Sequence, residues 1–126
     1  MFLNSNQRRK RMKTYTIFVS EEDINNYAKV SSDYNPIHMN KEEAKKYGFK
    51  DRIGHGMLSM GKVMAALSSS IPKRSYVKQY NMTFLSPLYI GQSISLTVEE
   101  KGETLHVKGV CEGENIVKGN ISFSSL

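Results

Sequence analysis

The hydrophobic pattern of the chain changes its period near Pro72. Before this proline, the segment GMLSMGKVMAALSSSI (56–71) carries apolar residues at 57, 60, 64, 67 and 71, which is the spacing of one helical face. Further apolar residues at 58, 63, 65 and 66 extend the apolar surface nearly around the helix. The pattern predicts a long helix, ended by Pro72, that is buried on most sides.

After Pro72, apolar and polar residues alternate with a period of two, which is typical of strands with one buried face. The alternation covers four segments: 79–84, 93–98, 104–108 and 117–123. Short links that contain glycine, at 100–103 and 112–115, predict antiparallel hairpins.

The segment before residue 56 mixes a strand pattern with short helical ones. TYTIFV (14–19) is rich in β-branched and aromatic residues and predicts a first strand. Ser20 and Asp23 resemble a capping box for a helix to about Val30, and Asn40 caps a second short helix that Gly48 can end. Five strands and one long apolar helix predict a single α+β domain, in which an antiparallel sheet wraps around the helix.

The two short helices are separated by DYNPIHMN (33–40), which has no regular period. Pro36 fixes its own φ and disfavours the helical region for Asn35, so we predict a rigid turn that presents Asp33 and His38. A partly buried carboxylate beside an imidazole can exchange protons with a substrate. Taken singly, Asp33 would instead be a turn residue and His38 a surface histidine.

Gly56 begins the long helix and has no side chain to cover its N–H. The first turn of a helix leaves N–H groups without partners, and the helix dipole favours negative charge there. An oxygen that becomes negative during a reaction could bind at this point. A glycine at a helix start more often serves packing. Gly56 is therefore a candidate site residue only in combination with Asp33 and His38.

Charge and cysteine content restrict the classes of function. The 126 residues carry a net charge of +6, but residues 1–13 hold five bases and no acid, which leaves 13 bases against 12 acids in the rest. We therefore expect a basic, disordered leader over 1–13, a domain over 14–126, and no nucleic-acid partner. No apolar run is long enough to span a membrane. The single Cys111 fits a reducing cytoplasm, and one cysteine with three scattered histidines predicts no metal site.

Several of these motifs resemble a known family. The stretch YAKVSSDYNPIHMNKEEAKKYGFKDRIGHGMLSMG resembles the hydratase signature of MaoC-like, (R)-specific enoyl-CoA hydratases. Its D-x-N-P-[IL]-H element matches at residues 33–38, its HGML element at 55–58, and its F-x-x-P…G element at Phe84, Pro87 and Gly91. The resemblance covers about Thr14 to Phe123.

The resemblance implies a hot dog fold, usually a homodimer or higher homo-oligomer with sheets joined edge to edge. It implies reversible hydration of a trans-2-enoyl thioester to the (R)-3-hydroxyacyl thioester, with coenzyme A as part of the substrate and no other cofactor. Asp33 and His38 would activate the water, and the Gly56 N–H would bind the carbonyl oxygen.

The resemblance also implies supporting roles for other residues. Asn35 would orient substrate or water, and His55 would support the turn. Many relatives carry a serine near the position of Met64, where this chain offers Ser59 and Ser68 instead.

Other functions fit parts of the pattern. A dehydratase acting on acyl carrier protein would use the same residues, and Lys73, Arg74 and Lys78 would suit either an acidic carrier or the phosphates of coenzyme A. They could equally form a solvated basic face. A hot dog module that only binds acyl thioesters would not need Asp33 and His38 together. A thioesterase of this fold usually has an acid on or beside the central helix, and residues 56–71 contain none.

Overall fold

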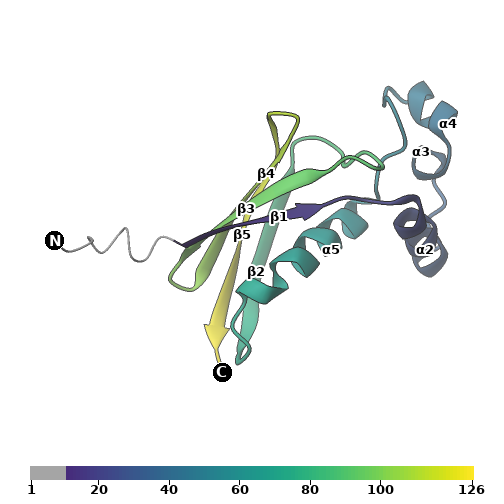
Figure 1. Ribbon diagram of the computed structural model, residues 1–126. Coiled ribbons are helices and arrows are strands. Elements are labelled where there is room, and N and C mark those ends of the chain that lie inside the picture. Colours follow the sequence, from purple (N-terminus) through teal and green to yellow (C-terminus); the bar gives the residue numbers. More distant parts are fainter. Residues whose placement is uncertain (1–10) are drawn as a thin grey trace. The chain divides into compact units, whose positions relative to one another are not determined.

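The computed structural model describes residues 11–126 (Figure 1). Two compact units are described separately: the sheet unit (residues 11–16, 66–86 and 94–126) and the helical unit (residues 17–65 and 87–93). The elements in chain order are β1 (Arg11–Ile17), α2 (Glu21–Ser31), α3 (Pro36–Met39), α4 (Lys41–Lys46), α5 (Gly56–Leu67), a 3-10 turn (Ser68–Ser70), β2 (Ser75–Phe84), β3 (Ile94–Lys101), β4 (Thr104–Cys111) and β5 (Glu114–Ser125). Within the described residues, every helix is too short or too polar to cross a bilayer.

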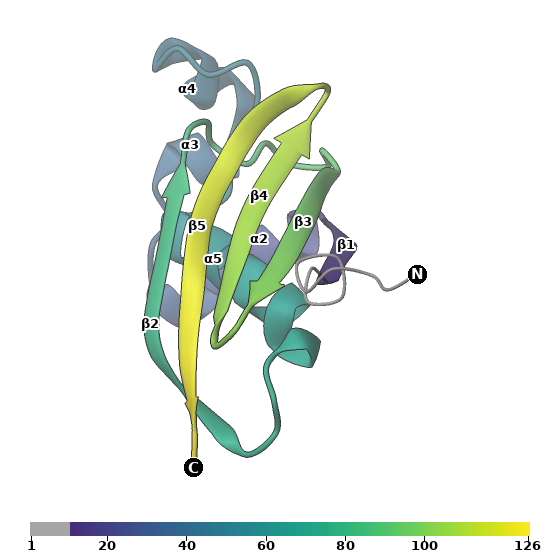
Figure 2. The ribbon, with the colours of Figure 1, turned by 90° about the vertical axis from the view of Figure 1, so that its left-hand side faces the viewer.

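The five strands form one sheet in the order β1-β3-β4-β5-β2, and Figure 2 shows them side by side. The pairs β3–β4, β4–β5 and β2–β5 are antiparallel, which confirms the predicted hairpins. Gly102 and Gly113 have φ values of 60° and 79°, so glycine supplies the left-handed backbone that each hairpin turn requires. The long strand β5 pairs with β4 on one side and with β2 on the other, which leaves β2 at an edge of the sheet.

The predicted alternation gives the sheet one buried and one wetter face. The buried side chains on the three central strands are Ile94, Leu96, Val98, Leu105, Val107, Ile116, Val117, Ile121 and Phe123. Apart from the adjacent pair Ile116 and Val117 on β5, their neighbours along each strand are polar and more exposed, as expected for a sheet with one apolar face.

The first strand begins earlier than predicted. β1 starts at Arg11, so residues 11–13, which we assigned to the leader, belong to the strand. Basic side chains are compatible with this strand because β1 pairs with β3 through backbone hydrogen bonds. The rest of the predicted leader, residues 1–10, lies outside the described residues.

The helical unit begins with the predicted capping box. The Ser20 hydroxyl accepts from the Asp23 N–H, and the Asp23 carboxylate accepts from the Ser20 N–H, both at 3.0 Å. The same carboxylate contacts Lys62 Nζ on α5 at 2.7 Å. Burial raises the pKa of Asp23, but the Lys62 ammonium and the Ser20 donors outweigh it and bring the pKa below its ordinary value. The box therefore caps α2 and joins it to α5.

The predicted ends of α4 and the start of α5 are also confirmed, whereas the α-helical part of α5 ends before the predicted Ile71. Asn40 caps α4 by accepting from the Glu43 N–H at 3.0 Å, and Gly48 follows the helix with φ 92°. α5 begins at Gly56, as predicted, and its α-helical part ends at Leu67 before the 3-10 turn.

The sheet predicts where a single methyl group is not tolerated. A Cβ on Gly119 would lie 2.0 Å from the Asn81 carbonyl oxygen of β2 and 2.7 Å from Met82 Sδ. Because backbone must shift to relieve this clash, Gly119→Ala should lower the free energy of unfolding by about 1–3 kcal/mol. Urea denaturation followed by circular dichroism measures the change.

The matched control is Gly61→Ala on α5, where a Cβ meets no atom within 4 Å. It should raise the free energy of unfolding by about 0.5–1 kcal/mol, because alanine is the better helix former. Equal effects of the two substitutions would contradict the described β2–β5 packing.

Candidate active site

The segment that carries the predicted acid–imidazole pair contains a helix that we did not predict. Asn35 is the N-cap of the one-turn helix α3, and its Oδ1 accepts from the Ile37 N–H at 3.2 Å. Pro36 occupies the first helical position, where the missing N–H would have had no helical partner. The prediction of a non-helical turn is therefore wrong for residues 36–39. Asp33 precedes the helix, and its carboxylate accepts from the Asn35 N–H at 3.1 Å.

His38 lies on α3, and its side chain is only 7% exposed. Its Nδ1 lies 2.7 Å from the Ile53 carbonyl oxygen, which can only accept a hydrogen bond. Nδ1 must therefore carry the proton, and Nε2 keeps a lone pair that can take a proton from another group. His38 is thus a buried, oriented base and not the surface histidine of the alternative interpretation.

The pKa of His38 is lowered, chiefly because burial disfavours the imidazolium. The bond to the Ile53 carbonyl raises it, His55 lowers it, and Asp33 raises it, but burial has the largest effect. A lowered pKa keeps the ring neutral at neutral pH, which is the state a general base needs.

Asp33, His38 and His55 come together in the helical unit. One potential ligand atom from each lies within 4.8 Å of the others. Asp33 is exposed, which corrects the expectation of a partly buried carboxylate, because the chain leaves α2 at Ser31 and stays at the surface until Ile37. The site thus combines an exposed acid with a buried base.

His55 adds a second buried ring to the pair. It stacks on His38 with ring centroids 3.8 Å apart and planes 24° from parallel. Its Nε2 donates to the Asp33 carbonyl oxygen at 3.0 Å, and its Nδ1 is buried with no hydrogen-bond partner in the described chain. His55 thus joins the backbone before α3 to the His38 ring, which agrees with a supporting role.

The cluster corrects one premise of the sequence analysis, since two of the three histidines are not scattered. Its geometry is nevertheless poor for a metal. A metal ion bound to histidine lies about 2 Å from nitrogen and close to the ring plane. Two rings stacked nearly in parallel cannot both place one ion in their planes at that distance. The arrangement favours proton transfer, and the absence of a metal stays a prediction.

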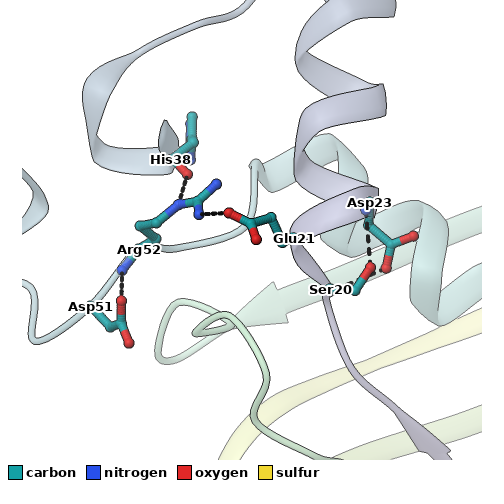
Figure 3. Close-up of polar contacts among 6 residues, drawn as sticks. All are labelled: Ser20, Glu21, Asp23, His38, Asp51 and Arg52. Carbon is teal, nitrogen blue, oxygen red and sulfur yellow. Dashed lines mark hydrogen bonds and ion pairs between the residues drawn. The ribbon is translucent and has the colours of Figure 1, made fainter. Parts of the chain in front are cut away.

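Arg52 positions the helix that carries His38, and the sequence analysis missed it. Its Nε donates to the His38 carbonyl oxygen at 2.6 Å, and its Nη1 contacts Glu21 Oε1 on α2 at 2.7 Å (Figure 3). Its own backbone N–H donates to Asp51 Oδ1. The Arg52 side chain is 12% exposed, whereas the Glu21 side chain is 69% exposed, so the contact joining α2 and α3 is shielded from water at its His38 end and open to water at its Glu21 end.

No local motif reveals the Arg52 contact, because its partners are a backbone oxygen and an acid 31 residues earlier. The Ile53 carbonyl was missed for a related reason. Any residue type can supply a carbonyl oxygen, so the sequence carries no sign of it.

Gly56 begins α5 directly after His55, and in residues 11–126 its N–H has no hydrogen-bond partner. A Cβ there would meet no atom within 4 Å other than those of its chain neighbours and its own helix, and Gly56 is exposed. Ser59 is buried and donates to the His55 carbonyl oxygen at 2.9 Å. Ser59 therefore holds the start of α5.

The remaining predicted residues have other surroundings. The side-chain oxygen of Asn35 is occupied as the N-cap of α3. Lys73, Arg74 and Lys78 are exposed and belong to the sheet unit, whereas Asp33 and His38 belong to the helical unit. Gly91, from the third motif, has φ 77° and donates to the Val19 carbonyl oxygen at 2.8 Å.

Comparison with known proteins identifies the family of this chain and several relatives. Residues 4–122 match the MaoC like domain family. The chain is 36% identical over 110 residues to an (R)-specific enoyl-CoA hydratase of Rhodospirillum rubrum, covering 80% of this chain and 76% of that protein. It is 45% identical over 75 residues to a mitochondrial 3-hydroxyacyl-[acyl-carrier-protein] dehydratase of Arabidopsis thaliana, covering 60% of this chain and 45% of that protein.

Solved structures of two hydratases have a similar fold. The R-hydratase of Pseudomonas aeruginosa has a TM-score of 0.77 and 25% identity, covering 92% of this chain and 80% of that one. The (R)-hydratase of Aeromonas caviae has a TM-score of 0.76 at 20% identity, covering 93% and 96%, which is a likeness of fold.

These matches define a class of hydratases and dehydratases, and the predicted α+β hot dog fold is confirmed. The chain belongs to the MaoC-like dehydratase family, whose members are hydro-lyases.

The lowered pKa of His38 predicts a pH dependence of stability. The unfolded chain has the higher histidine pKa, near 6.5, so it binds the proton more readily than the folded chain as the pH falls. The folded state should lose stability as the pH falls below about 6.5, and this loss is absent above that pKa, where both states are neutral. As the pH is lowered from about 7 to about 5, the melting temperature of the wild type should therefore fall more steeply than that of the His38→Gln variant. Equal slopes of melting temperature against pH for the two proteins would contradict the lowered pKa of His38.

Proposed function

We propose that this protein catalyses the reversible hydration of trans-2-enoyl-CoA to (R)-3-hydroxyacyl-CoA. The observation that carries the proposal is the cluster of Asp33 with the oriented, neutral His38. Such a pair can hold one water and exchange protons with it. Membership of the MaoC-like family and the similarity to the Rhodospirillum rubrum hydratase support the reaction class.

In the proposed reaction, Asp33 and His38 bind one water, and the pair takes a proton from it as the water oxygen bonds to C3. The electrons of the C2–C3 double bond move toward the thioester carbonyl, whose oxygen gains negative charge. C2 then takes a proton from the pair, which returns to its starting protonation state. Dehydration runs through the same steps in reverse.

The amide of Gly56 is the proposed donor to the thioester oxygen. Its N–H has no partner in the described residues, and Gly56 is exposed and has no side chain of its own. A donor aimed at an oxygen that becomes negative stabilises the transition state more than the ground state, and losing one donor typically costs about 10²–10³-fold in rate.

His55, Ser59 and Asn35 have supporting roles in this proposal. His55 limits the rotation of the His38 ring by stacking on it, and Ser59 limits movement of the His55 backbone. Asn35 fixes the start of α3, and its side-chain amide nitrogen remains the group that could contact substrate or water.

A second candidate is the same dehydration on an acyl carrier protein. It is favoured by the 45% identity to the Arabidopsis carrier-protein dehydratase. The exposed cations Lys73, Arg74 and Lys78 suit an acidic carrier as well as the phosphates of coenzyme A. That relative is named as mitochondrial, so a cytoplasmic location for this chain stays a prediction.

We further propose that the protein forms a homodimer through the β2 edge. β2 is an edge strand of ten residues, and its Tyr76 and Val77 are 51% and 40% exposed. An edge strand with unpaired backbone groups and exposed apolar side chains can pair with a second copy.

Sedimentation velocity tests the dimer. The wild type should sediment at about twice the 14.3 kDa of one chain, and Tyr76→Lys should shift the population toward monomer. The matched control is Tyr47→Lys, since Tyr47 is 70% exposed but lies in the helical unit. A wild type that stays monomeric at high concentration would rule out the proposed dimer.

Substitution of the acid–base pair tests the activity. Asp33→Asn and His38→Gln should each reduce the hydration rate of crotonyl-CoA by about 10²–10⁴-fold, because each removes a proton-transfer group. The loss of absorbance of the enoyl thioester measures the rate. The control Glu42→Gln removes an exposed carboxylate on α4 and should keep the rate within about twofold.

The same assay with crotonyl carrier protein separates the two candidates by the ratio of their kcat/KM values. If neither thioester is hydrated although one of them binds, the protein is a binding module and the enzymatic proposal fails.

A further inference from the structure

The polar face of the sheet contains a hollow that the proposed reaction does not use. It has a volume of about 590 Å³ and is lined by residues of β2, β3, β4 and β5 with Met12 of β1, all within the sheet unit. Figure 2 shows these strands side by side. The volume falls in the range of small-molecule sites, roughly 300–1,000 Å³.

The strand register places two lysines directly opposite each other in this hollow. Lys108 on β4 faces Lys118 on β5, Thr97 of β3 faces Lys108, and Thr83 of β2 faces Lys118. Two lysines thus stand between two threonines in one row across four strands. Like charges directly opposite each other in a sheet are destabilising.

The charge of this lysine pair is not neutralised by the protein. Both side chains are exposed, and within residues 11–126 neither makes an ion pair. The acid in the lining, Glu99, lies across from His106 and is bound to Lys101 at 3.0 Å. The hollow therefore has an excess of positive charge.

The adjacent row adds further hydrogen-bond donors. Asn81, Asn120 and His106 occupy neighbouring positions on β2, β5 and β4. No side chain of Phe, Tyr or Trp is among the described lining residues, so the imidazole of His106 is the one aromatic ring among them. Ammonium, hydroxyl and amide donors without a large aromatic surface favour a small ligand with several negative charges.

We propose that this hollow is a binding site for a diphosphate group, either as free pyrophosphate or as part of a nucleoside diphosphate. Lys108 and Lys118 would neutralise the two phosphates, and the flanking threonine and asparagine side chains would donate to their oxygens. An occupied site would also relieve the repulsion between the two lysines, so the ligand should stabilise the fold.

Isothermal titration calorimetry of the whole chain with pyrophosphate tests the proposal, with ADP as the second ligand. Pyrophosphate should bind, and binding should weaken as salt is added, because the contact is between charges at a surface. The double variant Lys108→Gln and Lys118→Gln should weaken binding at least tenfold. Equal affinities for ADP and pyrophosphate would indicate recognition of the diphosphate alone, and tighter binding of ADP would indicate a nucleotide.

The matched control removes two exposed lysines of the helical unit, Lys29→Gln with Lys41→Gln, and should leave the affinity within about twofold. The Lys108/Lys118 variant should melt at the same or a higher temperature than the wild type, because it loses a repulsive pair, so unfolding does not explain lost binding.

Three results would overturn the proposal. They are no binding by the wild type, equal weakening in both double variants, and a change in sedimentation of the Lys108/Lys118 variant without any pyrophosphate binding, which would assign this face to a second copy of the chain.

Discussion

The hydrogen bond from His38 Nδ1 to the Ile53 carbonyl is the interaction on which the candidate site depends. It fixes which ring nitrogen carries the proton, and thus which nitrogen can act as a base. It also fixes the direction of the ring, because the carbonyl belongs to backbone that is held on both sides. Ile53 donates its own N–H to the Ile37 carbonyl, and Gly54 donates to the Leu88 carbonyl.

The rest of the helical unit holds this bond in place. Arg52 binds the backbone of His38 and the carboxylate of Glu21, and His55 covers one face of the ring while it binds the Asp33 carbonyl. Close packing adds to these bonds, since a Cβ on Gly54 would lie 3.2 Å from Ser59 Oγ. A buried imidazole is thus oriented by contacts that are mostly to backbone, whereas the exposed Asp33 can meet water directly.

Much of the fold followed from the sequence because it rests on local and periodic rules. The period of two gave β3, β4 and β5, and the caps at Ser20 and Asn40 gave the starts of α2 and α4. The errors occurred where one rule competed with another. Pro36 breaks the interior of a helix, but it is tolerated at a helix start, where it lies in α3. The basic charge of residues 11–13 suggests a leader, but these residues belong to β1.

The candidate site was predictable only in part. Asp33, His38 and Gly56 could be named because a motif contains them, and the structure brings Asp33 and His38 together. The exposure of Asp33, the stacking of His55 and the role of Arg52 depend on contacts between segments that are distant in sequence. Periodicity and capping carry no information about such contacts.

The pairing of β2 with β5 has a consequence for how the chain folds. Ser75 pairs with Ser125 and Phe84 with Val117, so the β2 edge of the sheet closes only when residues 33 to 50 positions apart meet. Non-local pairing of this kind slows folding, because the entropy of the long loop is lost before the contacts form. The β3–β4–β5 meander has short connections and can form first. During synthesis on a ribosome, β2 would therefore leave the ribosome before its partner strand β5 has been made. Until β5 pairs with it, the backbone groups of β2 would be open to aggregation.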